Sequence, residues 1–161
     1  MNGNLFWAVI LFLSVQMLVS CTGQLSENVQ TENPEREIHD IWNQFIQDWE
    51  SEDAAACAYI YHSDALNIPQ ALQVNSGADS IEEFYAALFS NNQSSRYNHR
   101  SESIHFDQKL SVEYALFDVQ WITNEGDEWT YSARALIHWE KDETENWKIR
   151  KMLFNNPPES V

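Results

Sequence analysis

Residues 62–71, HSDALNIPQA, place a histidine, a serine and an aspartate next to one another shortly before a proline. His62, Ser63 and Asp64 are the residue types of a nucleophilic relay, in which each side chain must face the next. Neighbouring residues of an extended chain point to opposite sides instead. Pro69 disfavours helix at the residue before it, and an aspartate at such a place commonly bonds backbone amides. We therefore interpret this segment as a turn that leads into a strand, and not as a catalytic site.

Four further side chains are candidates for acid–base chemistry or anion binding: Tyr85, His99, Asp118 and Arg134. Asp118 interrupts an apolar strand pattern, and Arg134 and His138 alternate on the following strand. If these strand faces point inward, the three groups converge in a pocket, where a buried carboxylate beside an arginine can serve catalysis. If the faces point outward, the same groups are solvated or form a dimer contact.

No metal site is expected from the histidines. His99 and His105 are predicted to lie on one face of a strand, with Ser101 and Ser103 between them. At about 3.3 Å per residue they are roughly 20 Å apart, too far to share a metal ion. The sequence has no H-x-x-x-H pair, CxxC motif or clustered carboxylates. It therefore predicts neither a metal nor a cofactor.

The N-terminal segment indicates export and lipid anchoring. Residues 1–20 carry no charge and are apolar over a stretch that is short for a membrane span. They end in Leu18-Val19-Ser20-Cys21, which resembles the bacterial lipobox. The resemblance implies a lipoprotein signal peptide, a lipid on Cys21 and a protein anchored in the cell envelope, periplasmic or surface-facing. The alternative is an ordinary cleaved signal with a chance cysteine. Residues 21–34 are polar and aperiodic, and we interpret them as a flexible tether.

Charge and cysteine content narrow the remaining functions. The formal net charge is −16, and no Lys/Arg-rich stripe offsets it, which argues against nucleic-acid binding. An acidic surface is also poorly suited to anionic lipid headgroups, so attachment to a membrane must come from the lipid on Cys21. If Cys21 carries that lipid, Cys57 has no partner for a disulfide. Cys57 lies among alanines in a predicted helix, where it is expected to pack as a small side chain and not to act as a nucleophile.

The elements that must position these residues begin with a long amphipathic helix over residues 35–51, where apolar side chains recur at spacings of three and four. Asp53 can cap a second helix over 54–61, and Ser80-Ile81-Glu82-Glu83 is typical of a capping box that opens a third helix over 81–89. Alternating patterns then predict strands over 97–106, 112–122, 129–139 and 147–154, with a hairpin loop at 124–127 and a turn at 142–146. This order predicts an α+β fold in which three helices pack on one face of a curved, mostly antiparallel sheet.

In this order the segments resemble the nuclear-transport-factor-2-like superfamily, which includes SnoaL-like and steroid-isomerase-like proteins. The resemblance covers residues 36–156. It is carried by Asp64-Ala65 before the first strand, by the pattern G-x-x-x-I-x-x-F-Y from Gly77 to Tyr85, and by Trp147-Lys148-Ile149 near the end. It implies a half-open cone, in which a bent sheet wraps the long first helix around an apolar pocket. We place this domain at residues 35–156 and a short tail at 157–161.

The resemblance also indicates which catalytic roles are vacant. In the isomerase branch it places the general base at Ile68, or at Asn67 if the alignment shifts by one residue. The oxyanion-hole tyrosine falls on Phe45 and the supporting aspartate on Ile137. An apolar side chain can neither remove a proton nor stabilise a developing enolate by a hydrogen bond. Only the supporting tyrosine has a match, at Tyr85, and steroid-isomerase chemistry is not expected.

A pocket between helix and sheet is the remaining candidate site. Its expected lining is Phe45, Trp49, Tyr61, Asn67, Tyr85, Phe117, Ile137 and Trp139. Such a lining suits a flat or hydrophobic small molecule. With Ile137 turned into the pocket, Arg134 and His138 point to the outer face of the sheet.

Three functions are compatible with the sequence. The leading interpretation is a lipid-anchored protein that binds a small hydrophobic or aromatic molecule without catalysis. The second is a cone-fold enzyme of the dehydratase, cyclase or hydrolase kind, which would use Tyr85 with Asp118, His99 or Arg134. The third is a structural or protein-interaction module that forms a homodimer through its outer sheet face. Fold alone does not choose among them.

Overall fold

The computed structural model describes residues 33–157. In chain order the elements are α1 (Pro34–Glu50), α2 (Ala54–Tyr59), β1 (Tyr61–Pro69), β2 (Asn75–Ser76), α3 (Ala78–Ser90), β3 (Asn92–Asp107), β4 (Leu110–Thr123), β5 (Glu128–Lys141) and β6 (Trp147–Asn155). The expected signal peptide, most of the tether, the lipidation of Cys21 and the tail from residue 158 lie outside the described residues. Within residues 33–157 no helix is both long and apolar enough to cross a membrane.

Helix α1 forms where the apolar spacing predicted it. The side chain of Asn33 accepts a hydrogen bond from the backbone N–H of Arg36 at 3.2 Å, and Pro34 occupies the first turn, where its missing N–H costs nothing. The apolar stripe is buried, and its members are Ile38, Trp42, Phe45 and Trp49. This stripe supplies one wall of the protein core.

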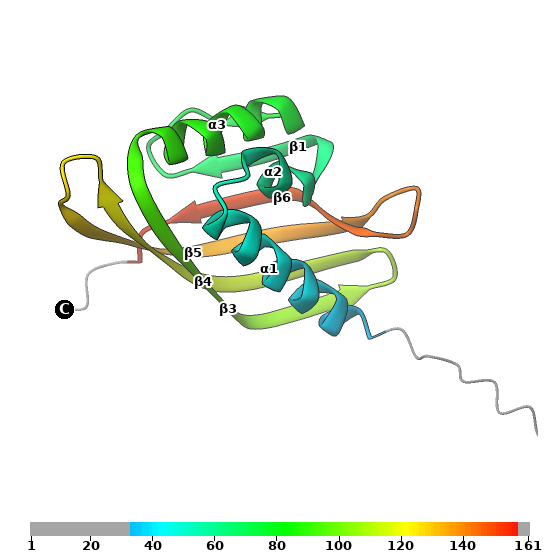
Figure 1. The fold of residues 1–161 in the computed structure, drawn as a ribbon. Coiled ribbons are helices and arrows are strands. Elements are labelled where there is room, and N and C mark those ends of the chain that lie inside the picture. The colour runs from blue at the N-terminus through cyan, green and yellow to red at the C-terminus, as the bar shows by residue number, and fades with distance from the viewer. Residues whose placement is uncertain (1–32, 158–161) are drawn as a thin grey trace, which may run out of the picture. The chain divides into compact units, whose positions relative to one another are not determined.

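The six strands form one sheet in the order β2-β1-β6-β5-β4-β3. All neighbours are antiparallel except β1 and β6, which run parallel. Figure 1 shows the three helices on one side of this curved sheet. The α+β prediction is therefore confirmed, and so are the hairpin between β4 and β5 and the turn between β5 and β6.

The start of α3 differs from the prediction. The helix begins at Ala78, and Gly77 takes the capping position without a side-chain hydrogen bond, so the predicted capping box at Ser80 is wrong. Gly77 has φ of +86° and donates its N–H to the carbonyl of Ala65 at 2.9 Å. A Cβ atom on this residue would lie only 3.3 Å from the carbonyl oxygen of Ser63. Glycine fits there because it lacks that Cβ.

The segment from His62 to Pro69 also differs from the prediction. All of it belongs to strand β1, and Asp64 is exposed and pairs with Arg150 on β6. The expected bond from Asp64 to backbone amides of a turn is therefore wrong. Asp64 contributes to pairing between neighbouring strands instead.

Strand β3 is longer than predicted and changes face part of the way along. It begins at Asn92, five residues before the expected start, and a bulge between Ser101 and Ser103 shifts its register against β4. A bulge inserts one extra residue and reverses which side chains point inward. His105 is consequently exposed while Ile104 packs against the core, so the prediction that His99 and His105 share one face is wrong.

Candidate ligand-binding pocket

A cavity of about 290 Å³ lies between helices α1 and α3 and the inner face of the sheet. Its wall is lined by Trp42, Phe45, Trp49, Phe84, Tyr85, Leu88, Tyr97, Phe117, Val119, Trp121, Trp129, Tyr131, Met152 and Phe154, with Pro69, Gln70, Ala71, Leu72 and Asn156 completing it. None of these residues is Asp, Glu, Lys, Arg or His. As far as residues 33–157 form it, the cavity is thus an aromatic chamber without a charged side chain in its wall.

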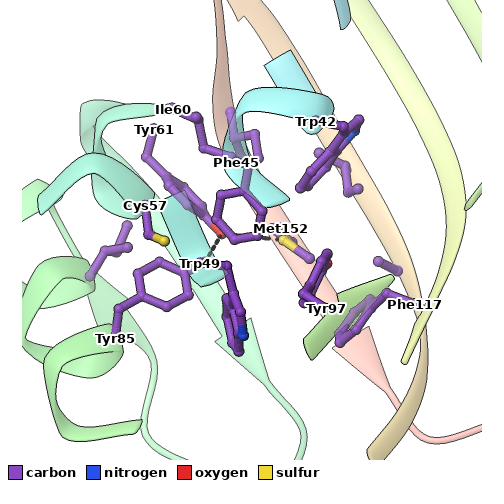
Figure 2. Packing of buried hydrophobic residues seen from close by; sticks show 14 of the residues in the cluster. Trp42, Phe45, Trp49, Cys57, Ile60, Tyr61, Tyr85, Tyr97, Phe117 and Met152 are labelled. Carbon is purple, nitrogen blue, oxygen red and sulfur yellow. Dashed lines mark hydrogen bonds between the residues drawn. The ribbon is translucent and has the colours of Figure 1, made fainter. Parts of the chain in front are cut away.

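Aromatic contacts fix the shape of this chamber. Phe45 meets Trp42 and Tyr97 nearly edge to face, at 88° and 76°, and Trp49 meets Tyr85 at 82°. Figure 2 shows these rings converging from α1, α3 and the sheet. Edge-to-face pairs add stability beyond that of buried area. The wall is therefore held by many mutually supporting rings.

Half of the predicted lining faces this cavity. Phe45, Trp49, Tyr85 and Phe117 line it, whereas Tyr61, Asn67, Ile137 and Trp139 are buried without lining it. The reason lies in the strand register. The lining pairs Val119–Tyr131 and Trp121–Trp129 are close to the β4–β5 hairpin, but Ile137 and Trp139 pair with Glu113 and Ser111, further from it. The cavity occupies the hairpin end of the sheet, and Ile137 and Trp139 belong to the solid core beyond it.

Tyr85 is unsuited to proton abstraction. Its hydroxyl lies 2.9 Å from that of Tyr61, which also donates to the sulfur of Met152 at 3.3 Å (Figure 2). Burial, followed by the nearby Tyr61, raises the pKa of Tyr85 well above its usual value of 10.0. Burial likewise raises the pKa of Tyr61. Both hydroxyls therefore stay protonated at neutral pH.

The other catalytic candidates do not meet at the cavity. Asp118 is exposed on the outer face of β4, and Arg134 on β5 donates from Nε to the side-chain oxygen of Asn155 at 3.0 Å. His99 points inward, but it pairs with Glu113 on β4 and does not line the cavity. The structure therefore brings none of these three together with Tyr85.

A buried polar cluster on β3, β4, β5 and α1 was not predicted from the sequence. Its centre is Glu113, whose side chain is fully buried. Trp42 and Trp139 donate their indole N–H groups to Glu113 Oε2 at 3.0 and 2.8 Å. Nε2 of His99 lies 2.8 Å from Oε1, and the hydroxyl of Ser101 donates to the same oxygen. Four groups thus satisfy one carboxylate.

The charge state of Glu113 follows from these partners. Burial acts to raise the pKa of the carboxyl group, but the hydrogen bond and charge of His99 and the bonds from Ser101 and Trp42 outweigh it, and the pKa lies below the usual 4.5. Trp42 stacks on His99 with ring centroids 3.8 Å apart and separates it from the chamber. Strand alternation could have indicated this cluster, because Glu113 shares a face with Ala115 and Phe117. We interpret it as a structural element.

The remaining candidate groups offer no reactive centre. Cys57 is fully buried, and burial, followed by the charges of Asp48 and Asp53, raises the pKa of its thiol from 9.0 to about 12. A thiol is nucleophilic only as the thiolate, so Cys57 is inert in the folded protein. Among the residues that the structure describes, no group of three His, Cys, Asp or Glu side chains could hold a metal ion.

The positions that correspond to the isomerase roles lie at different depths in the fold. Phe45 lines the chamber, Ile137 is buried beyond it, and Asn67, not Ile68, is the fully buried member of the pair on β1. Both polar atoms of the Asn67 side chain are buried without a hydrogen-bond partner in the described protein. An amide is neither an acid nor a base at neutral pH, so the base position stays unfilled.

The arrangement of elements and cavity defines the nuclear-transport-factor-2-like cone fold, as the resemblance predicted. A scan against protein-family models and a search of curated proteins find no match to this sequence. Solved structures do match. A nuclear transport factor 2 (NTF2-like) superfamily protein from Salmonella enterica serovar Typhimurium LT2 has a TM-score of 0.68 at 16% identity, covering 79% of this chain and 93% of its own.

Two further structures show the same fold. A ketosteroid isomerase-like protein from Erwinia carotovora atroseptica has a TM-score of 0.65 at 12% identity and covers 76% of this chain and 95% of its own. An NTF2-like protein with a cystatin-like fold from Novosphingobium aromaticivorans has a TM-score of 0.66 at 11% identity, covering 79% of this chain and 84% of its own. At identities this low, the structural match establishes the shared fold alone, and function must be argued from the site.

Proposed function

We propose that this protein binds a small hydrophobic or aromatic molecule without transforming it, at the cell envelope, where a lipid on Cys21 anchors it. The observation that carries the binding role is the chamber of about 290 Å³, in which no described lining residue has a charged or histidine side chain. Pockets of this kind remove most of an apolar ligand's surface from water. The lipobox-like sequence before Cys21 supports the anchor.

The titratable groups of the chamber wall differ from those that an enzyme needs, which supports binding without catalysis. General acid–base catalysis needs a titratable group within hydrogen-bond reach of the reacting atoms, with a pKa near the working pH. The titratable groups of the wall are Tyr85, Tyr97 and Tyr131, and burial raises the pKa of each. For the alternative of a dehydratase, cyclase or hydrolase, the described wall of the chamber therefore supplies no general base.

Filling the chamber is expected to abolish binding. Leu88 on α3 lines it and is half-buried, so Leu88→Trp should occupy the space that a ligand needs. A ligand at about one hundred times its dissociation constant stabilises the native protein by about 2.7 kcal/mol. Thermal shift against a panel of hydrophobic compounds, with native mass spectrometry to detect copurified molecules, should find a ligand for the original protein and none for Leu88→Trp.

The matched control is Leu116→Trp, which adds the same ring on the outer face of β4, outside the chamber. It should bind as the original protein does. Equal binding by both variants would contradict the proposed site, and no bound mass together with no shift across the panel would contradict the binding function.

A second proposal, self-association through the outer sheet face, is supported by an exposed apolar row. Strand register places Tyr114, Leu136 and Leu153 side by side across β4, β5 and β6. Their exposed fractions are 40%, 54% and 48%. Exposed apolar side chains that adjoin one another mark interaction sites more often than isolated ones do. A homodimer that buries this row would remove it from water.

Leu136→Lys is expected to dissociate such a dimer, because it places a charge at the centre of the row. Sedimentation equilibrium should give the mass of two chains for the original protein and of one chain for the variant. Leu72→Lys, at a leucine that is 64% exposed beside the chamber, serves as the control and should remain dimeric. A single-chain mass for the original protein at about 100 μM, a concentration well above the Kd of a stable dimer, would refute the proposal.

A further inference from the structure

The wall of the chamber consists mainly of aromatic side chains. Eleven of its lining residues are Trp, Tyr or Phe. The rings of Phe117, Tyr131 and Phe154 meet one another at angles between 49° and 77°, so they surround the space from several directions. An aromatic ring carries partial negative charge on its faces and attracts a cation placed over them, most strongly for tryptophan.

Acidic side chains predominate around the chamber, although Arg96 lies beside Trp121 and Trp129. Helix α3, which supplies Phe84, Tyr85 and Leu88 to the wall, carries Asp79, Glu82 and Glu83 and no Lys or Arg. The β4–β5 hairpin, next to Trp129, carries exposed acids at positions 125, 127 and 128 and again no basic residue. With a formal net charge of −16, the whole chain raises the local concentration of cations and repels anions.

We propose that the chamber selects an organic cation, of the quaternary ammonium or charge-delocalised aromatic class, over a neutral molecule of the same shape. This inference rests on the binding function proposed above and specifies its ligand. Attraction to the ring faces replaces the weak hydration of such a cation, and the acidic surroundings favour its approach.

The hydrogen-bonding groups of the wall favour a quaternary ammonium over a primary amine. A primary ammonium has three N–H donors that need acceptors once water is removed. The hydroxyl of Tyr85 is engaged by Tyr61, and the side-chain oxygen of Gln70 accepts from the backbone N–H of Asn156 at 2.6 Å. The other side-chain acceptors of the wall are the neutral oxygens of Tyr97, Tyr131 and Asn156, and none of the described lining residues carries a carboxylate. A quaternary ammonium has no N–H donor, so it gives up no hydrogen bond to water when it enters the chamber.

The test compares two probes that differ only in charge. Phenyltrimethylammonium and tert-butylbenzene have the same shape, with nitrogen in one replacing the quaternary carbon of the other. Titrations of the purified protein, followed by tryptophan fluorescence, should give a dissociation constant about tenfold lower for the cation. Trp129→Leu keeps an apolar side chain at a partly exposed lining position and removes the ring. It should therefore weaken binding of the cation more than binding of the neutral probe.

Three outcomes decide the inference. Tighter binding of phenyltrimethylammonium that falls in Trp129→Leu supports it. Equal or tighter binding of tert-butylbenzene overturns the inference and leaves the proposed binding function intact. The same conclusion follows if neither probe binds but a neutral compound from the panel does. If no probe and no panel compound binds, the inference and the proposed function fall together.

Discussion

Replacing Glu113 with alanine is expected to lower the free energy of unfolding by about 3–5 kcal/mol, the range for removing one partner of a buried ionic cluster. The substitution leaves the indole N–H groups of Trp42 and Trp139 without their acceptor and His99 without its partner. Each of these groups is buried, and a buried donor without an acceptor retains the full cost of losing its water. Urea denaturation at neutral pH measures the loss.

The control for this prediction is Glu102→Ala on β3. Glu102 pairs with Arg100, and both side chains are partly exposed to solvent, so its removal should cost less than about 1 kcal/mol. Similar losses for the two alanine variants would show that the Glu113 cluster does not stabilise the fold.

The pH dependence of stability should identify the same carboxylate. Because its partners hold the pKa of Glu113 below the usual 4.5 in the folded protein, its contribution is fully present above about pH 5. That contribution is lost as pH falls through the folded pKa. Glu113→Gln does not titrate, so the difference in unfolding free energy between it and the original protein should shrink on acidification. Asp142, whose pKa is also lowered, is present in both proteins and cancels. A difference that stays constant down to about pH 3 would contradict this account.

Trp49→Ala is expected to destabilise the protein by about 3–5 kcal/mol, the range for deleting a large buried aromatic side chain. Trp49 is 3% exposed, donates its indole N–H to the hydroxyl of Ser95 at 2.7 Å, and contacts the rings of Phe89, Tyr97 and Trp121. Its removal enlarges the chamber and leaves these rings without a common neighbour. Urea denaturation again gives the loss, and near-ultraviolet circular dichroism should report looser ring packing.

Trp129→Ala provides the matched comparison. Trp129 also lines the chamber and stacks on Trp121 at 17°, but it is 46% exposed. Its loss should therefore cost about 1 kcal/mol or less. Equal destabilisation by the two alanine variants would mean that the depth of a ring in the chamber does not determine its contribution.

The features that could be predicted from the sequence are those with a strong repeating signal. Spacings of three and four in residues 35–51 identified the buried stripe of α1, and alternation identified most strand faces. Assigning Ile137 to the interior also placed Arg134 and His138 on the outer face of the sheet. Local periodicity is sufficient here because burial is decided by which face a residue occupies.

The features that escaped prediction depend on contacts between distant segments. The bulge after Ser101 reverses the face of the end of β3, and no residue type at that place announces it. The start of α3 at Ala78 depends on its capping residue Gly77, which approaches Ser63 of β1 closely. The extent of the chamber could not be read from the sequence either, because strand register decides that Ile137 and Trp139 pack beyond it. Alternation places Glu113 on the inner face of β4, but its partners His99 and Trp42 come from other elements and could not be assigned to it from the sequence.

The parallel pairing of β1 with β6 has a consequence for the order of folding. Leu66 pairs with Lys151, so the strand that follows the second helix finds its central neighbour only in the last strand of the domain. Contacts that join distant parts of a chain form slowly, because the loop between them must close first. During synthesis, the antiparallel strands β3, β4 and β5 can pair as each is made. Strand β1 meanwhile lacks the partner for the edge that pairs with β6. The sheet is completed only when β6 has been made and inserts between β1 and β5.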